Sequence, residues 1–87
     1  MTVTKAPTMV REIDPGALAA FKAEMARRTV DLDLYNLTFF ATDELFIVAT
    51  SYKEKPRGLR GSVPGFPDYE VKILRSDNRV QSVSIAR

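Results

Sequence analysis

The chain has 87 residues, a formal net charge of +2, 45% apolar and 28% charged residues, which fits one soluble globular domain rather than a disordered or fibrous chain. It has no cysteine and no histidine, which excludes disulfides, thiolate metal sites, cysteine nucleophiles and a conventional Ser-His-Asp triad. No apolar run approaches the roughly 18 residues of a membrane span. We therefore expect a cytoplasmic protein with no membrane span, no metal and no cofactor.

Residues 1–11 show no hydrophobic period and include Pro7. We expect this segment to be a flexible N-terminal arm or, at best, an added edge strand. Residues 12–87 are then a single domain.

A helix is predicted from Asp14 to about Thr29. Asp14 is typical of an N-cap residue, and Pro15 suits the first helical position, where no backbone N–H is needed. The apolar stripe of this helix recurs at helical spacing and consists of Ala17, Leu18, Ala20, Phe21 and Met25. Such a stripe predicts packing against a core.

From about Leu34 the hydrophobic period changes to two, and a second apolar run follows the turn residues Asp43 and Glu44. This pattern predicts a hairpin in which Phe39 faces Val48. The face expected to receive the helix carries Tyr35, Leu37, Phe39, Ala41, Phe46, Val48 and Tyr52.

The opposite face of this hairpin is more apolar than a solvated face requires. It carries Phe40, Leu45, Ile47 and Ala49 beside Asn36, Thr38 and Ser51. We expect Phe40, Leu45 and Ile47 to bury themselves in a homodimer or against another protein.

A long basic loop, residues 52–68, separates this hairpin from the next. It contains the cations Lys53, Lys55, Arg57 and Arg60, and Phe66 near its end. The spacing of its glycines does not match a phosphate-binding loop. Two alternatives remain for the cations, a solvated turn or a surface that binds an acidic partner. Phe66 is expected to anchor the loop to the sheet or to contact that partner.

A second hairpin is predicted in the last part of the chain. An odd loop of three or five residues aligns Tyr69, Val71 and Ile73 with Val83 and Ile85, with Asn78 at positive φ. The predicted fold is therefore α+β, with one N-terminal helix packed on a four-stranded antiparallel meander.

Two pairs of carboxylates are candidates for acid-base chemistry or metal binding, Asp31 with Asp33 and Asp43 with Glu44. A pair of carboxylates alone supplies neither a complete metal shell nor an assigned acid and base. We expect both pairs to be solvated and predict no catalytic residue.

The order of the predicted elements and four short segments carry a resemblance to a known group of proteins. The segments are Arg57-Gly58-Leu59-Arg60-Gly61-Ser62, Pro64-Gly65, Tyr69-Glu70-Val71 and the final Val83-Ser84-Ile85-Ala86-Arg87. Together with the element order, they resemble the small bacterial cystatin-like (NTF2-like) α+β proteins. Several proteins of this group resemble immunity or inhibitor proteins. The resemblance covers residues 12–87 and implies no catalytic residues.

Three functions are compatible with the sequence. The favoured one is a non-enzymatic protein-binding module that uses the basic loop 52–68 and a sheet face. The alternative is a small-ligand binder or enzyme with a concave pocket in which Tyr35, Tyr52 and Tyr69 are polar groups. Nucleic-acid binding is disfavoured, because the positive charges are scattered along the chain.

Overall fold

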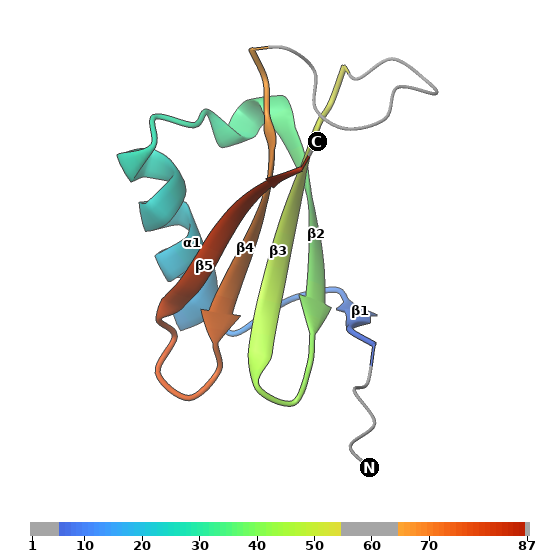
Figure 1. Cartoon of the computed structure of the whole chain (residues 1–87), viewed down its shortest axis with the longest axis vertical. Coiled ribbons are helices and arrows are strands. Elements are labelled where there is room, and N and C mark those ends of the chain that lie inside the picture. Colours follow the sequence, from blue (N-terminus) through green and yellow to red (C-terminus); the bar gives the residue numbers. More distant parts are fainter. Residues whose placement is uncertain (1–5, 55–64, 87) are drawn as a thin grey trace.

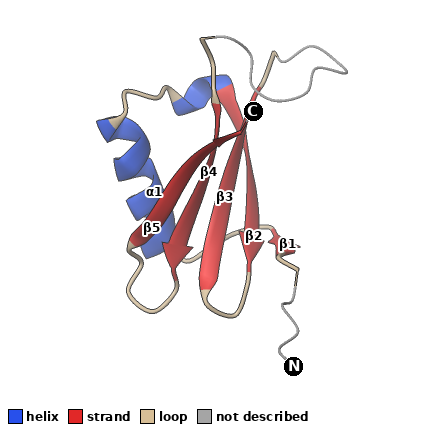
Figure 2. Ribbon diagram, in the orientation of Figure 1, coloured by secondary structure: helices blue, strands red, loops and turns tan. Residues whose placement is uncertain are grey.

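The computed structural model describes residues 6–54 and 65–86. In these ranges the helices are α1 (Pro15–Arg27) and the short 3-10 helix η1 (Leu32–Leu34). The strands are β1 (Thr8–Val10), β2 (Tyr35–Ala41), β3 (Leu45–Tyr52), β4 (Asp68–Leu74) and β5 (Val80–Ala86). They form one antiparallel five-stranded sheet in the order β1-β2-β3-β4-β5, and α1 lies on one side of it (Figures 1 and 2). The predicted α+β class is confirmed.

The sheet has a fifth strand, so the predicted count of four is not confirmed. Thr8–Val10 pair with the outer edge of β2, where Met9 lies opposite Phe40. Part of the N-terminal segment is thus an edge strand, which is the second of the two predicted alternatives for it. The sequence does not indicate this strand, because three residues are too few to show an alternation of apolar and polar side chains. The pairing gives hydrogen-bond partners to backbone groups along the edge of β2.

Helix α1 begins as predicted and ends slightly earlier. The Asp14 side chain accepts a hydrogen bond from the Gly16 N–H at 3.0 Å, which caps the first turn. The helix ends at Arg27 because Thr29 has a φ of 56°, a left-handed conformation that ends helices. Phe21 and Met25 are completely buried and contribute to the core between α1 and the sheet.

The first hairpin has the predicted register. Phe39 is paired with Val48, and the Thr42 N–H donates to the Leu45 carbonyl at 2.8 Å. The Thr42 hydroxyl also accepts a hydrogen bond from the Leu45 N–H at 3.0 Å, which fixes the turn. The face that includes Phe39 and Val48 packs against α1, as predicted.

The second hairpin has the predicted strand alignment, but an even turn and a bulge produce it instead of an odd loop. Val71 is paired with Val83 and Tyr69 with Ile85. The predicted odd loop is wrong: the Leu74 N–H donates to the Arg79 carbonyl, so the turn between them is even. Gln81 is the extra residue of a bulge in β5 and restores the alignment.

Two side chains of the second turn tie one end of the molecule together. Asn78, at the predicted positive φ (58°), donates from its amide to the Asp14 carboxylate at 3.0 Å. The Arg75 guanidinium donates to the Thr42 carbonyl at 2.7 Å and lies 4.8 Å from the centre of the Phe46 ring. The helix start and both hairpin turns are therefore joined at this end of the sheet.

Candidate functional site

At the other end of the sheet, the segment predicted as the loop 52–68 is shorter than expected, because Tyr52 belongs to β3 and Asp68 to β4. Where these two strands separate, side chains make the hydrogen bonds between them. The Thr50 hydroxyl accepts from the Tyr69 N–H at 2.7 Å, and the Asp68 carboxylate accepts from the Tyr52 N–H at 3.0 Å. Both side chains are buried, with Thr50 4% and Asp68 5% exposed. These bonds fix the two ends of the loop relative to each other. Sequence reasoning assigned no role to Thr50 or Asp68.

Phe66 anchors the end of the loop to the sheet. Its ring is stacked on Tyr52, with ring centres 4.3 Å apart and planes inclined by 13°. Tyr52 in turn meets Tyr35 edge to face at 6.1 Å. Phe66 is half-buried in this stack, as expected for an anchoring aromatic. Its predicted contact with a partner stays a prediction.

A cavity of about 290 Å³ lies between the end of α1 and the end of the loop. Tyr35, Tyr69, Phe66 and Arg28 are among its lining residues. Two of the three tyrosines expected to line a pocket are therefore brought together. Tyr52 is absent from the lining and acts instead as the platform on which Phe66 stacks.

The surroundings of the Tyr35 phenol favour its neutral form. Burial raises the pKa of Tyr35 above the ordinary value of 10.0, and the nearby Tyr69 and Asp68 raise this pKa further. A neutral phenol can donate a hydrogen bond to a ligand but is a poor base at physiological pH.

Tyr35 should make stability depend on pH in alkaline solution. Because its pKa is raised by folding, the stability associated with the neutral phenol is fully present below the unfolded pKa of 10.0 and is lost as pH rises through the higher folded pKa. Tyr35→Phe should reduce this loss. The measurement is urea unfolding from about pH 9 upward, where the unfolded phenol begins to ionise. An unchanged slope in the variant would contradict the assignment.

The second candidate site is the sheet face opposite α1, which we call the open face. It carries Met9, Phe40, Ile47 and Leu45, and Glu70 and Lys72 from β4. Met9 is 67% exposed, and Phe40 and Leu45 are half-buried. A shallow cavity of about 200 Å³ is lined by Pro7, Phe40, Ile47 and Glu70.

The three residues predicted for self-association are not equally accessible on this face. Phe40 is paired with Ile47, and Leu45 lies two residues from Ile47 on the same strand face. Ile47 is only 5% exposed, because its neighbours cover it. The apolar surface of the open face therefore comes from Phe40, Leu45 and Met9, and little of it comes from Ile47.

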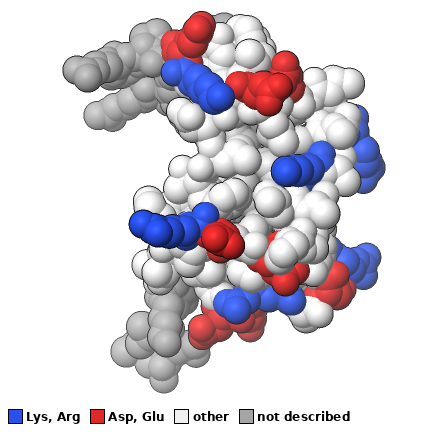
Figure 3. Space-filling view, turned by 180° about the vertical axis from the view of Figure 1, so that it is seen from behind, with Lys and Arg blue, Asp and Glu red and all other residues white. Residues whose placement is uncertain are grey.

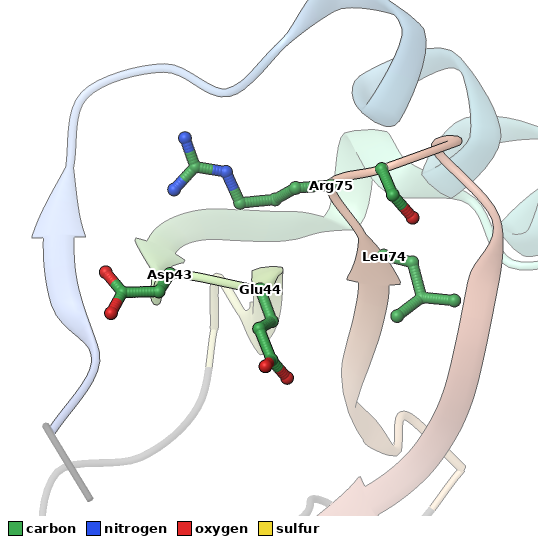
Figure 4. A pocket seen from close by; sticks show the side chains of 5 residues that line it. Asp43, Glu44, Leu74 and Arg75 are labelled. Atoms are coloured by element: carbon green, nitrogen blue, oxygen red, sulfur yellow. The ribbon is translucent and has the colours of Figure 1, made fainter.

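A wider hollow of about 420 Å³ lies between the two hairpin turns (Figure 4). Asp43, Glu44, Leu74, Arg75 and Ser76 line it. In Figure 4 the carboxylates of Asp43 and Glu44 point away from the Arg75 guanidinium, which is engaged with the Thr42 carbonyl instead. The hollow therefore contains no arrangement of converging groups, and we assign it no chemistry.

The other predicted carboxylates have local structural roles or lie at the surface. Asp31 accepts a hydrogen bond from the Asp33 N–H at 3.0 Å and so caps η1. Within residues 6–54 and 65–86, no group of three or more acidic side chains could hold a metal ion. Seen from behind, basic and acidic side chains of this part lie beside one another without a large field of either sign (Figure 3).

Only part of the basic loop lies within the described residues. Lys53 is exposed at the end of β3, and its N–H donates to the Leu34 carbonyl at 2.9 Å. Lys55, Arg57 and Arg60 lie outside the described residues. Their role in partner binding stays a prediction.

Comparisons with known proteins give no relative from which a function can be transferred. No family model, no curated protein and no solved structure matches the chain. The cystatin-like resemblance therefore stays a prediction. In the described residues, no helix has the length and apolar character needed to cross a membrane.

Proposed function

We propose that the protein is a non-enzymatic protein-binding module that recognises its partner through the open face. The observation that carries this proposal is the row formed by Met9 and Phe40 on a sheet side that α1 does not cover. An apolar patch of this kind on a small domain is typical of an interaction surface.

The composition of the open face supports a protein as its partner. Phe40, Leu45 and Met9 supply an apolar centre, while Glu70 and Lys72 on β4 supply charges of both signs beside it. Protein interfaces combine an apolar centre with a polar rim in this way. A nucleic acid instead requires a concentrated positive field.

The basic loop is the second part of the proposed surface. Its cations Lys53, Lys55, Arg57 and Arg60 suit an acidic partner, whose encounter they would accelerate at low salt. An immunity or inhibitor role follows from the cystatin-like resemblance and belongs to the same proposal. A second copy of the chain is the other possible occupant of the open face.

The test is capture of a partner from a cell extract, followed by titration of the purified partner with matched variants. Phe40→Asp should weaken binding strongly, whereas Leu34→Asp on η1 should not, although Leu34 is also an exposed apolar side chain (39%). Equal binding by wild type and Phe40→Asp would reject the open face as the recognition surface.

A small-ligand site is the second candidate function, and the cavity beside Tyr35 and Tyr69 favours it. Tyr35 and Tyr69 bring phenol groups to its lining, and Phe66 adds an aromatic ring. Arg28 also lines the cavity, although its guanidinium already donates to the Glu24 carboxylate at 3.0 Å. Leu34 lines the same cavity. Loss of binding in Leu34→Asp but not in Phe40→Asp would therefore favour this function over the first.

A further inference from the structure

The two edges of the sheet differ in how well they are protected from pairing with another chain. At one edge, β1 has three residues and follows Pro7, and both features discourage further pairing. At the other edge, β5 has seven residues, VQSVSIA, with no proline and no charged side chain. Within the described residues, β5 pairs only with β4. It thus offers a long, uncharged edge.

We propose that β5 pairs antiparallel with β5 of a second copy of this chain, around a two-fold axis at Ser84. The sheet then continues across both copies, and the two α1 helices lie on the same side of it. This pairing uses the β5 edge and not the apolar row of Met9, Phe40 and Leu45 on the open face, so the proposal does not rest on the proposed function.

The side-chain pattern of β5 is complementary to itself in this register. Antiparallel pairing about Ser84 places Val83 opposite Ile85 of the second copy, and Ile85 opposite its Val83. Val83 packs against the core cluster, whereas Ile85 is 52% exposed on the same face of the sheet. Pairing would therefore cover Ile85 with an apolar partner on both sides of the axis.

The residues near the axis also favour a copy of the same strand. Ser84 lies opposite its own equivalent, and two serines are small enough to meet without a steric conflict. The absence of charge from Val80 to Ala86 means that pairing identical strands brings no like charges together. A two-fold axis uses the same patch on both copies, and this edge satisfies that requirement.

Cysteine cross-linking tests the register, because the chain contains no native cysteine. Ser84→Cys places its two thiols across the axis, where opposite Cα atoms are about 4.5–5.5 Å apart and a disulfide can form. Gln81→Cys is the matched control: it is also exposed on β5, but its two copies would lie about 20 Å apart. Under mild oxidation, Ser84→Cys should cross-link about tenfold faster or more.

Two further substitutions test whether the cross-linking depends on the β5 edge. Adding Ile85→Lys to Ser84→Cys should reduce the cross-linking rate to that of Gln81→Cys, because a lysine on an edge opposes pairing. Adding Met9→Lys, which introduces a lysine on the exposed β1 edge instead, should leave the fast rate unchanged. Equal rates for Ser84→Cys and Gln81→Cys, or a fast rate that survives Ile85→Lys, would overturn the proposal. Adding Phe40→Asp should not alter the rate, which separates this pairing from binding at the open face.

Discussion

Phe21→Ala should lower the free energy of unfolding by about 3–5 kcal/mol, the usual cost of removing a buried phenylalanine side chain. Phe21 is 0% exposed and lies in the core cluster with Val48 and Val71. A small domain has only about 5–15 kcal/mol of stability in total, so this substitution alone removes a large part of it. The measurement is urea unfolding followed by circular dichroism.

Lys22→Ala is the matched control, since Lys22 is exposed on the same helix. It should change stability by no more than about 0.5 kcal/mol. Equal effects of Phe21→Ala and Lys22→Ala would mean that α1 does not pack on the sheet through Phe21, and would contradict the fold.

Phe40→Asp should weaken partner binding by about 30-fold or more, since central aromatic residues of an interface can contribute about 2 kcal/mol or more each. The substitution also places a carboxylate in an apolar contact, where it loses hydration. Phe40 is half-buried on the open face and absent from the core cluster, so the fold should survive. Calorimetric titration with the purified partner measures the first effect and a thermal melt measures the second.

Leu34→Asp controls for the introduction of a charge at an exposed apolar position elsewhere on the molecule. It should bind the partner as the wild type does. Unfolding of the Phe40→Asp variant would mean that Phe40 belongs to the core, and a folded variant with normal affinity would mean that the open face is not used.

Much of the fold is encoded locally and could be predicted from the sequence. Asp14 and Pro15 mark the helix start because they act within one turn. The pairing of Phe39 with Val48 follows from a short turn and from alternation on both strands. In each case the deciding residues are close in the chain, and the period shows which side chains share a face.

Other features depend on geometry that only the folded chain provides. The bonds from Thr50 and Asp68 join residues 19 and 16 positions apart across the loop, and no period in the sequence indicates them. A bulge at Gln81 takes the place of the expected odd loop. The sequence pattern cannot distinguish the two, because a bulge and an extra loop residue give the same alignment further along β5. Strand β1 is recognisable only through its pairing with β2.

The candidate site was predictable in part. The alternation in β2 placed Phe40 on the face away from α1, and the observed register agrees. The exposure of each residue was not predictable, because Ile47 is covered by neighbours from adjacent strands. Two of the tyrosines considered for a pocket share a cavity, while Tyr52 serves to hold Phe66.

The most direct test of the proposed function is to map the bound partner by amide NMR shifts during titration into the isotope-labelled protein. The open-face proposal predicts that the largest shift changes lie at Met9, Phe40 and Glu70, with small changes along α1. Changes concentrated instead around the cavity of Tyr35 and Tyr69, with the open face unaffected, would contradict it.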